Sequence, residues 1–216
     1  MNAWLILAQH SGLILRGLLV TAEITVISAV LALLLGLFLF QLRLRFPLIS
    51  PLVRGFIDLM RCTPFLIFLY LVYYALPGWG IELDAFNAGI LALTLYNAAY
   101  FTELFSAAWA QFPREPVEAG LAFGFHGFGL FRRIILRPLI GIALPSLGNQ
   151  TIQIIKDSAF LVIVTVQELT YAANEIQATY YIPFASFVVA ALLYWGLCLI
   201  VEAGVRRSLR RSAQML

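Results

Sequence analysis

Charged residues are scarce in this chain of 216 residues. Asp, Glu, Lys and Arg make up 12% of it, against about 25% in soluble domains. Hydrophobic residues make up 62%, without counting the 15 glycines, and the mean hydropathy is +0.92. One soluble core cannot bury so much apolar surface. The composition therefore excludes a water-soluble globule and indicates an integral membrane protein.

Several functional groups are also rare or missing. Cys62 and Cys198 are too few for a disulfide framework, and we expect both to be free thiols. His10 and His126 have no Cys or His neighbour at ligand spacing, which predicts no metal site. The chain has 14 basic residues against 11 acidic ones, which are too few for a surface that binds nucleic acid. No G-x-x-x-x-G-K-[ST] loop occurs, so this chain is not expected to bind ATP.

Uncharged or nearly uncharged stretches recur along the chain at membrane-spanning length. A helix needs about 20 mostly apolar residues to cross a hydrocarbon core of about 30 Å. Five stretches meet this requirement, at about 18–41, 62–81, 86–108, 142–166 and 183–201. Residues 1–15 are apolar but lack the basic start of a signal peptide, so we interpret them as an interfacial lead-in. The sequence predicts an all-α integral membrane fold of five transmembrane helices in a single domain, residues 1–216.

Basic residues are concentrated in three of the connecting segments. Twelve of the 14 Lys and Arg lie between the first two spans, between spans three and four, or after span five. The connections 79–85 and 167–182 contain no Lys or Arg. Short cytoplasmic loops retain an excess of Lys and Arg. This distribution predicts that the N-terminus lies outside and the C-terminus lies in the cytoplasm.

The loop 111–141 is unusually long and apolar for a segment on the cytoplasmic side. Pro113 and Pro116 predict a short helix with Glu115 and Glu118 in its first turn, where acids favour the helix dipole. Gly124 is expected to end it, and a second short helical run is expected at 131–136. The segment is predicted to form a compact helical knob, residues 111–141. Its phenylalanines either dock a partner or dip into the inner leaflet, and composition alone does not decide between the two.

An ordered set of motifs runs through almost the whole chain. Glu118-Ala119-Gly120, three residues, Gly124, nine residues and Ile134-Ile135-Leu136 resemble the E-A-A, x3, G, x9, I-x-L-P signature of bacterial ABC importer permeases. Further matches resemble the R-G-T-P, A-Y-x-x-E, I-A-L-P, L-G-N-Q and K-D-[ST] motifs of the polar amino-acid branch, which carries histidine, glutamine, arginine or cystine. They lie at 60–64, 99–103, 142–145, 147–150 and 156–158.

This resemblance implies a fold, a function and a set of partners. The fold is the type I ABC importer transmembrane domain, and the loop 111–141 holds the coupling helix that inserts into a separate nucleotide-binding ATPase subunit. ATP and Mg then belong to that subunit, and this chain is not an enzyme. A second permease subunit, identical or homologous, an external substrate-binding protein, an amino-acid substrate and membrane lipid complete the system in the bacterial inner membrane. The resemblance assigns ATPase coupling to Glu118, Ala119, Gly120 and Gly124.

Three positions depart from the family pattern. Cys62 stands where the family usually has Gly, Gly120 where it has the second Ala, and Arg137 where it has Pro, with Pro138 one place later. Gly120 is expected to weaken the short helix by about 1 kcal/mol relative to Ala.

The fourth predicted span carries the most polar atoms. Gln150, Gln153 and Asp157 follow i, i+3, i+7 spacing, with Asn149 and Lys156 beside them. An ionisable group at the bilayer centre costs about 2.5 to 3.5 kcal/mol, so such groups normally face a wet path or a partner. We therefore hypothesise that this face borders the substrate path. The alternative is that Lys156 and Asp157 compensate each other's charge or pair across a permease dimer.

Glu103 is a second acid within a predicted span. It faces either the substrate path or another helix, where it would form an interhelix hydrogen bond near the cytosolic end of span three.

Two other functional classes fit less well. A self-sufficient ion-coupled carrier would use Asp157, Glu103 and Lys156 as a proton relay, but such carriers usually contain inverted repeats, and five spans do not divide into equal halves. An intramembrane enzyme would need a nucleophile and a base, yet no G-x-S-x-G occurs and both histidines lie outside the spans. The sequence favours a permease subunit driven by a separate ATPase.

Overall fold

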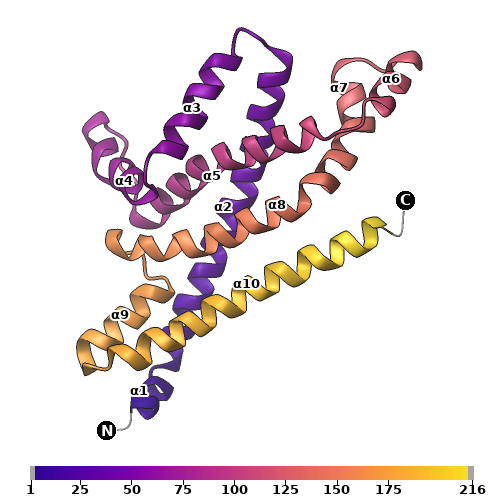
Figure 1. Ribbon diagram of the computed structural model, residues 1–216. Helices are drawn as coiled ribbons and strands as arrows, with labels where there is room; N and C mark the ends of the chain where they lie inside the picture. Colours follow the sequence, from indigo (N-terminus) through magenta and orange to yellow (C-terminus); the bar gives the residue numbers. More distant parts are fainter. Residues whose placement is uncertain (1–2, 214–216) are drawn as a thin grey trace.

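The computed structural model describes residues 3–213, and every regular element in that range is helical (Figure 1). The α-helices are α1 Ala3–Gln9, α2 Ser11–Arg45, α3 Ser50–Cys62, α4 Phe65–Tyr70, α5 Ala85–Ala110, α6 Glu115–Ala122, α7 Gly127–Leu130, α8 Leu136–Asp157, α9 Leu169–Tyr180 and α10 Pro183–Ala213. Leu71–Ala75 and Phe131–Ile135 are π-helical, whereas Leu76–Trp79 and Ser158–Val164 are 3₁₀-helical.

The α2 and α5 helices form the centre of the molecule, and small residues let them approach closely. A Cβ built on Gly36 of α2 would lie 2.6 Å from the Phe101 Cβ and 3.0 Å from the Ala98 carbonyl oxygen of α5. Thr102 Oγ1 also lies 3.2 Å from the Gly36 carbonyl oxygen, to which it donates a hydrogen bond. Small residues commonly bring transmembrane helices into backbone contact in this way. The close contact at Gly36 packs α2 against α5, and the other helices pack around these two.

Within residues 3–213, two helices are long and apolar enough to cross a membrane by length and composition alone, namely α2 and α10. The α3 helix and residues 65–79 together make a third candidate that is bent by 108°. The α5 and α8 helices have 26 and 22 residues. The predicted spans 18–41, 86–108 and 183–201 lie within α2, α5 and α10.

The predicted span 62–81 corresponds to one helical segment, residues 65–79, which changes from α-helix to π-helix at Leu71 and to 3₁₀-helix at Leu76. The chain forms α3, turns through the extended residues Thr63 and Pro64, and then continues as α4. Proline disfavours helical backbone in the residue before it, which explains the break at this point. From the sequence, α3 is expected to belong to the connection between the first two spans, because Arg54 and Arg61 interrupt its apolar run. Its Val53, Ile57 and Met60, at i, i+4, i+7, are nevertheless buried against the rest of the chain.

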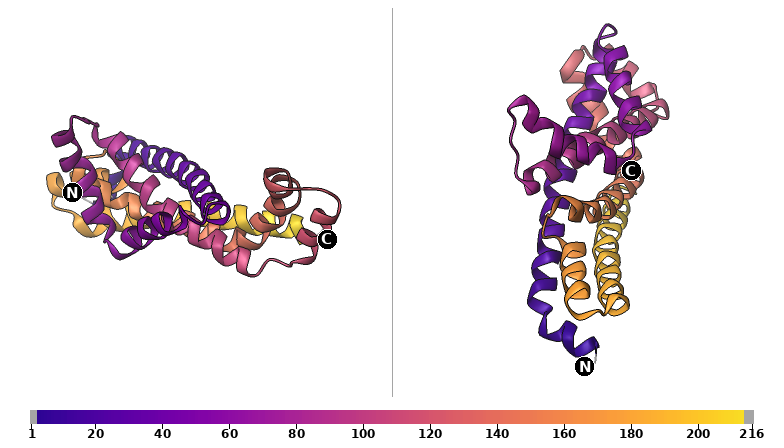
Figure 2. Two further views of the ribbon diagram at one scale, coloured as in Figure 1. Left: turned by 90° about the horizontal axis from the view of Figure 1, so that it is seen from above. Right: turned by 90° about the vertical axis from the view of Figure 1, so that its left-hand side faces the viewer.

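The predicted span 142–166 and the connection after it also differ from the structure. The backbone stays helical from Gly127 through α7, the π-helical turn and α8, so 131–136 is not a separate run. After Asp157 the chain changes to a 3₁₀-helix, and α9 then occupies most of the expected outer connection 167–182. The α9 helix packs against α2 and α10, and Figure 2 shows the three side by side.

Candidate functional site

The knob, residues 111–141, is built around α6, which starts and ends as the sequence predicts. Pro116 lies in the first turn with Glu115 and Glu118. Gly124 has a φ of +79°, in the left-handed region that glycine adopts without strain. The Phe125 and Gly124 amides donate to the carbonyl oxygens of Gly120 and Leu121, both at 3.0 Å. This pair of hydrogen bonds is a Schellman motif, which satisfies the last carbonyl groups of α6.

Gly120 is the point where α6 contacts the helix that follows it. A Cβ at this position would lie 2.5 Å from Ile134 Cδ1 and 2.6 Å from Leu130 Cδ1. The absence of a side chain therefore lets Ile134 and Leu130 pack directly on the α6 backbone. The helix-propensity cost expected for Gly120 is real for an isolated helix, but here it accompanies a closer contact.

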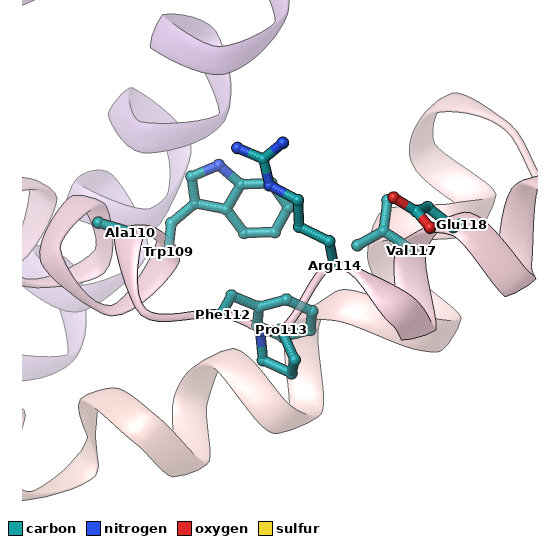
Figure 3. Close-up of a pocket in the computed structure, with 7 residues that line it drawn as sticks. All are labelled: Trp109, Ala110, Phe112, Pro113, Arg114, Val117 and Glu118. Carbon is teal, nitrogen blue, oxygen red and sulfur yellow. The ribbon is translucent and has the colours of Figure 1, made fainter.

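The outer surface of the knob is apolar. Phe123, Phe128 and Leu121 are 84%, 60% and 45% exposed. A hollow of about 350 Å³ lies beside α6, between the end of α5 and the first turn of α6 (Figure 3). Trp109 and Phe112 stack in its wall with ring centroids 5.2 Å apart, and Figure 3 shows charged Arg114 and Glu118 at its edge. Apolar area of this kind, rimmed by charges, is typical of a docking surface.

The polar residues of α8 divide between two faces. Gln150 turns toward α5, where its Nε2 donates to Asn97 Oδ1 at 2.7 Å. Gln153 instead donates to Asp157 Oδ1 at 2.8 Å, one turn along the same helix. The structure thus brings Gln153 and Asp157 together, as their spacing predicts, whereas Gln150 holds two helices together.

Three of the predicted path residues are exposed on α8. Asn149, Gln153 and Lys156 follow i, i+4, i+7 spacing and form one polar stripe, whereas Asp157 beside them is 5% exposed. Among the described residues no ion pair within 4.0 Å joins Lys156 to Asp157. The two side chains therefore make no direct ion-pair contact in this structure.

Glu103 forms an ion pair between the two central helices. Arg43 Nη1 of α2 lies 2.6 Å from Glu103 Oε1 of α5, and the same guanidinium donates to Ser106 Oγ at 3.3 Å. This is the interhelix role that the sequence left open as the alternative to a place on the substrate path.

Glu168 is a buried acid in the segment 167–182, which the sequence predicts only as an outer connection. Its side chain is fully buried and caps α9 by accepting hydrogen bonds from the Thr170 and Tyr171 amides at 2.8 Å. The Tyr194 hydroxyl of α10 also donates to it, and Thr21 of α2 accepts from the Leu169 amide. This network joins α2, α9 and α10. An acid directly before an apolar periodic run was the available signal, because such residues cap helices.

Residues 28–214 match the family model described as "Binding-protein-dependent transport system inner membrane component". The chain belongs to this family. It is 33% identical to the probable amino-acid ABC transporter permease PatM of Vibrio harveyi, over 88% of this chain and 86% of that protein. It is also 33% identical to the histidine/lysine/arginine/ornithine transport system permease HisQ of Escherichia coli, over 85% and 86% of the two chains.

Solved structures agree with the family membership. The chain resembles an amino acid ABC transporter crystallised with histidines, with a TM-score of 0.87, 27% identity and coverage of 98% and 99%. The MetNI methionine ABC transporter shares the fold, with a TM-score of 0.77 at 19% identity. The chain is therefore an ABC transporter permease subunit with the type I importer fold. The ion-coupled carrier considered from the sequence is not supported.

Proposed function

We propose that this permease forms the translocation path of an importer for polar amino acids and couples it to ATP hydrolysis in a separate subunit. The main support for this proposal is the structure of the knob. In it, α6 ends at Gly124, packs against the following helix at Gly120, and is surrounded by exposed apolar side chains. A monomer does not usually leave such a surface uncovered in water, which supports docking of an ATPase subunit on α6. Glu118, Ala119, Gly120 and Gly124 are the proposed coupling residues.

The same proposal includes a path lined by α8. The exposed stripe of Asn149, Gln153 and Lys156, together with Asp157, offers amide, ammonium and carboxylate groups at membrane depth. These groups match the carboxylate, the ammonium and the polar side chain of an amino acid. The names of HisQ and of the amino acid transporter support this substrate class. Gln150 of α8 and Glu103 of α5 would contribute to this path by holding the helices around it in place, through their contacts with Asn97 and Arg43.

The topology and the remaining partners are also part of the proposal. The five proposed membrane crossings rest on the apolar stretches of the sequence, and the distribution of basic residues favours an N-terminus outside and a C-terminus in the cytoplasm. One bundle of this size encloses little space, so a second permease subunit would complete the path. An external binding protein would meet the outer connections, 79–85 and the exposed end of 167–182. ATP and Mg would bind in the ATPase subunit.

The direct test of coupling is Gly124→Val, a β-branched residue in left-handed backbone. The strain should displace the end of α6, so ATPase stimulation and uptake should both fall to background while membrane insertion is unchanged. The matched control is Gly129→Ala in the same knob, where an added Cβ meets no atom within 4 Å and φ is not positive. Normal uptake by Gly124→Val would refute the coupling role of α6.

A further inference from the structure

The α8 and α9 helices lie one after the other along α10, with a break between them. A Cβ built on Gly148 of α8 would lie 2.5 Å from Val205 Cγ2, in the last part of α10. Thr170 Oγ1 of α9 instead lies 2.9 Å from the Tyr194 hydroxyl oxygen, in the first half of α10. The two helices and residues 158–168 between them therefore form one passage along α10 that is interrupted near its middle. Transporters commonly place their substrate sites at discontinuous membrane helices.

The backbone of this break is strained at Thr165. This residue ends the 3₁₀-helix with a φ of +64°. A β-branched residue rarely adopts left-handed backbone, because its Cβ then lies too close to the following carbonyl oxygen. Thr165 is exposed, and its hydroxyl makes no hydrogen bond within residues 3–213. No contact of its own side chain therefore offsets the strain, and strained backbone of this kind is concentrated in functional and switching segments.

The outer side of the break is tied to α2 as well as to α10. The Glu168 carbonyl oxygen would lie 2.9 Å from a Cβ built on Gly17, so the backbones of α9 and α2 touch at this point. At the other end of α9, the Tyr180 hydroxyl oxygen lies 3.2 Å from His10 Nε2. Together with the Glu168 carboxylate network, these contacts hold α9 to the first part of α2 along its whole length.

Two buried hydroxyl groups of α2 have no hydrogen-bond partner. Thr21, which accepts from the Leu169 amide, begins a buried row that continues with Thr25 and Ser28 at i+4 and i+7. Neither Thr25 Oγ1 nor Ser28 Oγ has a partner among the described residues, and α2 also contacts the 3₁₀-helix. Buried polar groups are normally hydrogen-bonded, and hydroxyl side chains can satisfy backbone groups where a membrane helix breaks. The two hydroxyls can therefore bind backbone groups of the break in a second conformation.

We propose that residues 158–167 are a hinge, about which α8 and its polar stripe move while Glu168 holds α9 to α2 and α10. The strain at Thr165 lowers the barrier to leaving the conformation described above. This inference rests on the proposed substrate path along α8. Glu168 and Tyr194 are positioning residues, since both act on the helices and not on the substrate.

The test changes the strain at Thr165 and little else. Thr165→Asn introduces a residue that tolerates left-handed backbone, so the purified chain in detergent should melt at a higher temperature. The same change should slow uptake by the full transport complex about fivefold, because the relieved conformation is harder to leave. The matched control Thr165→Val keeps the branched side chain and the strain, so it should retain the uptake rate of the wild type.

Two results with Thr165→Asn would overturn the hinge. A higher melting temperature with a normal uptake rate would show that the strain has no part in transport, and an unchanged melting temperature would show that the turn is not strained. The melting measurement needs no transport. Absence of uptake by the wild-type complex would therefore contradict the proposed function, while the melting temperature still decides whether the turn is strained.

Tyr194→Phe tests the support on the outer side of the hinge. It removes the hydroxyl that donates to Glu168 and keeps the ring, so the fold should remain while α9 is held less firmly. The number of amino-acid molecules imported per ATP hydrolysed should fall about twofold or more, since α9 would then move together with α8. Tyr74→Phe removes an exposed hydroxyl that makes no hydrogen bond within residues 3–213, and it should keep the wild-type ratio. An unchanged ratio in Tyr194→Phe would overturn the role of Glu168.

Discussion

At the scale of single residues, glycines and acids carry most of the functional argument. Gly124 could be predicted as a helix end, because glycine is the residue that most readily adopts the backbone that ends a helix. The role of Gly120 could not, because it depends on Leu130 and Ile134 meeting the α6 backbone. For the same reason the sequence grouped Gln150 with Gln153 and Asp157, and only the structure shows its hydrogen bond to Asn97.

Asp157→Asn tests the proposed path at this scale. Asparagine keeps an oxygen that can accept from Gln153 Nε2, so the fold should be retained while the negative charge is lost. Loss of an interaction with a substrate ammonium group should raise KM for uptake by about tenfold, which corresponds to about 1.4 kcal/mol. Uptake by proteoliposomes measures this, with Asp58→Asn, an exposed acid on α3, as the control. Unchanged kinetics with unchanged assembly would assign Asp157 a structural role.

At the scale of helices, apolar length predicts where a helix exists better than where it bends. The long uninterrupted stretches of α2, α5 and α10 were predicted because periodicity is strongest there. The α3 helix was missed because its arginines lie on an exposed face and interrupt the apolar stretch. The length of apolar stretches does not detect a helix that is buried on only one face. The α9 helix was missed because tertiary contacts, including the Glu168 network, stabilise a segment too polar to be recognised as a span.

The α2 and α5 contact gives a prediction for stability. Gly36→Ala places a Cβ against the backbone of α5 and should lower the free energy of unfolding by about 1 to 3 kcal/mol, the usual effect of overpacking. The control Gly12→Ala, on the same helix but with open space around it, should be neutral or slightly stabilising. Unfolding curves in detergent compare the two. Equal stability of Gly36→Ala and the wild type would show that the helices separate easily at this crossing.

The Arg43 and Glu103 pair provides a second test at this scale, by exchange of charges. Arg43→Glu and Glu103→Arg should each reduce uptake by placing like charges together between α2 and α5. The double exchange should restore most of the uptake if the role of Glu103 is the interhelix ion pair. If thermal stability returns in the double variant but uptake does not, Glu103 contributes to the substrate path itself.

At the scale of the whole molecule, the two proposed tasks, ATPase coupling and translocation, lie on different parts of the fold. The α8 helix, which carries the polar stripe, packs along the helical bundle, and the knob lies at the N-terminal end of α8, as Figure 1 shows. A continuous helical backbone from Gly127 to Asp157 connects them, so movement of the knob can be transmitted to the stripe. The family could be recognised from the sequence because the motifs occur in a fixed order along almost the whole chain. The bend of 108° between α3 and residues 65–79 occurs at Pro64, but its size could not be predicted from the proline alone.

The most direct test of this account is amino-acid accumulation in proteoliposomes that contain ATP. The purified chain alone should neither hydrolyse ATP nor concentrate an amino acid, because it has no phosphate-binding loop. Addition of the ATPase subunit and the external binding protein should produce ATP-dependent accumulation. Accumulation against a gradient by vesicles that contain only this chain would contradict the account.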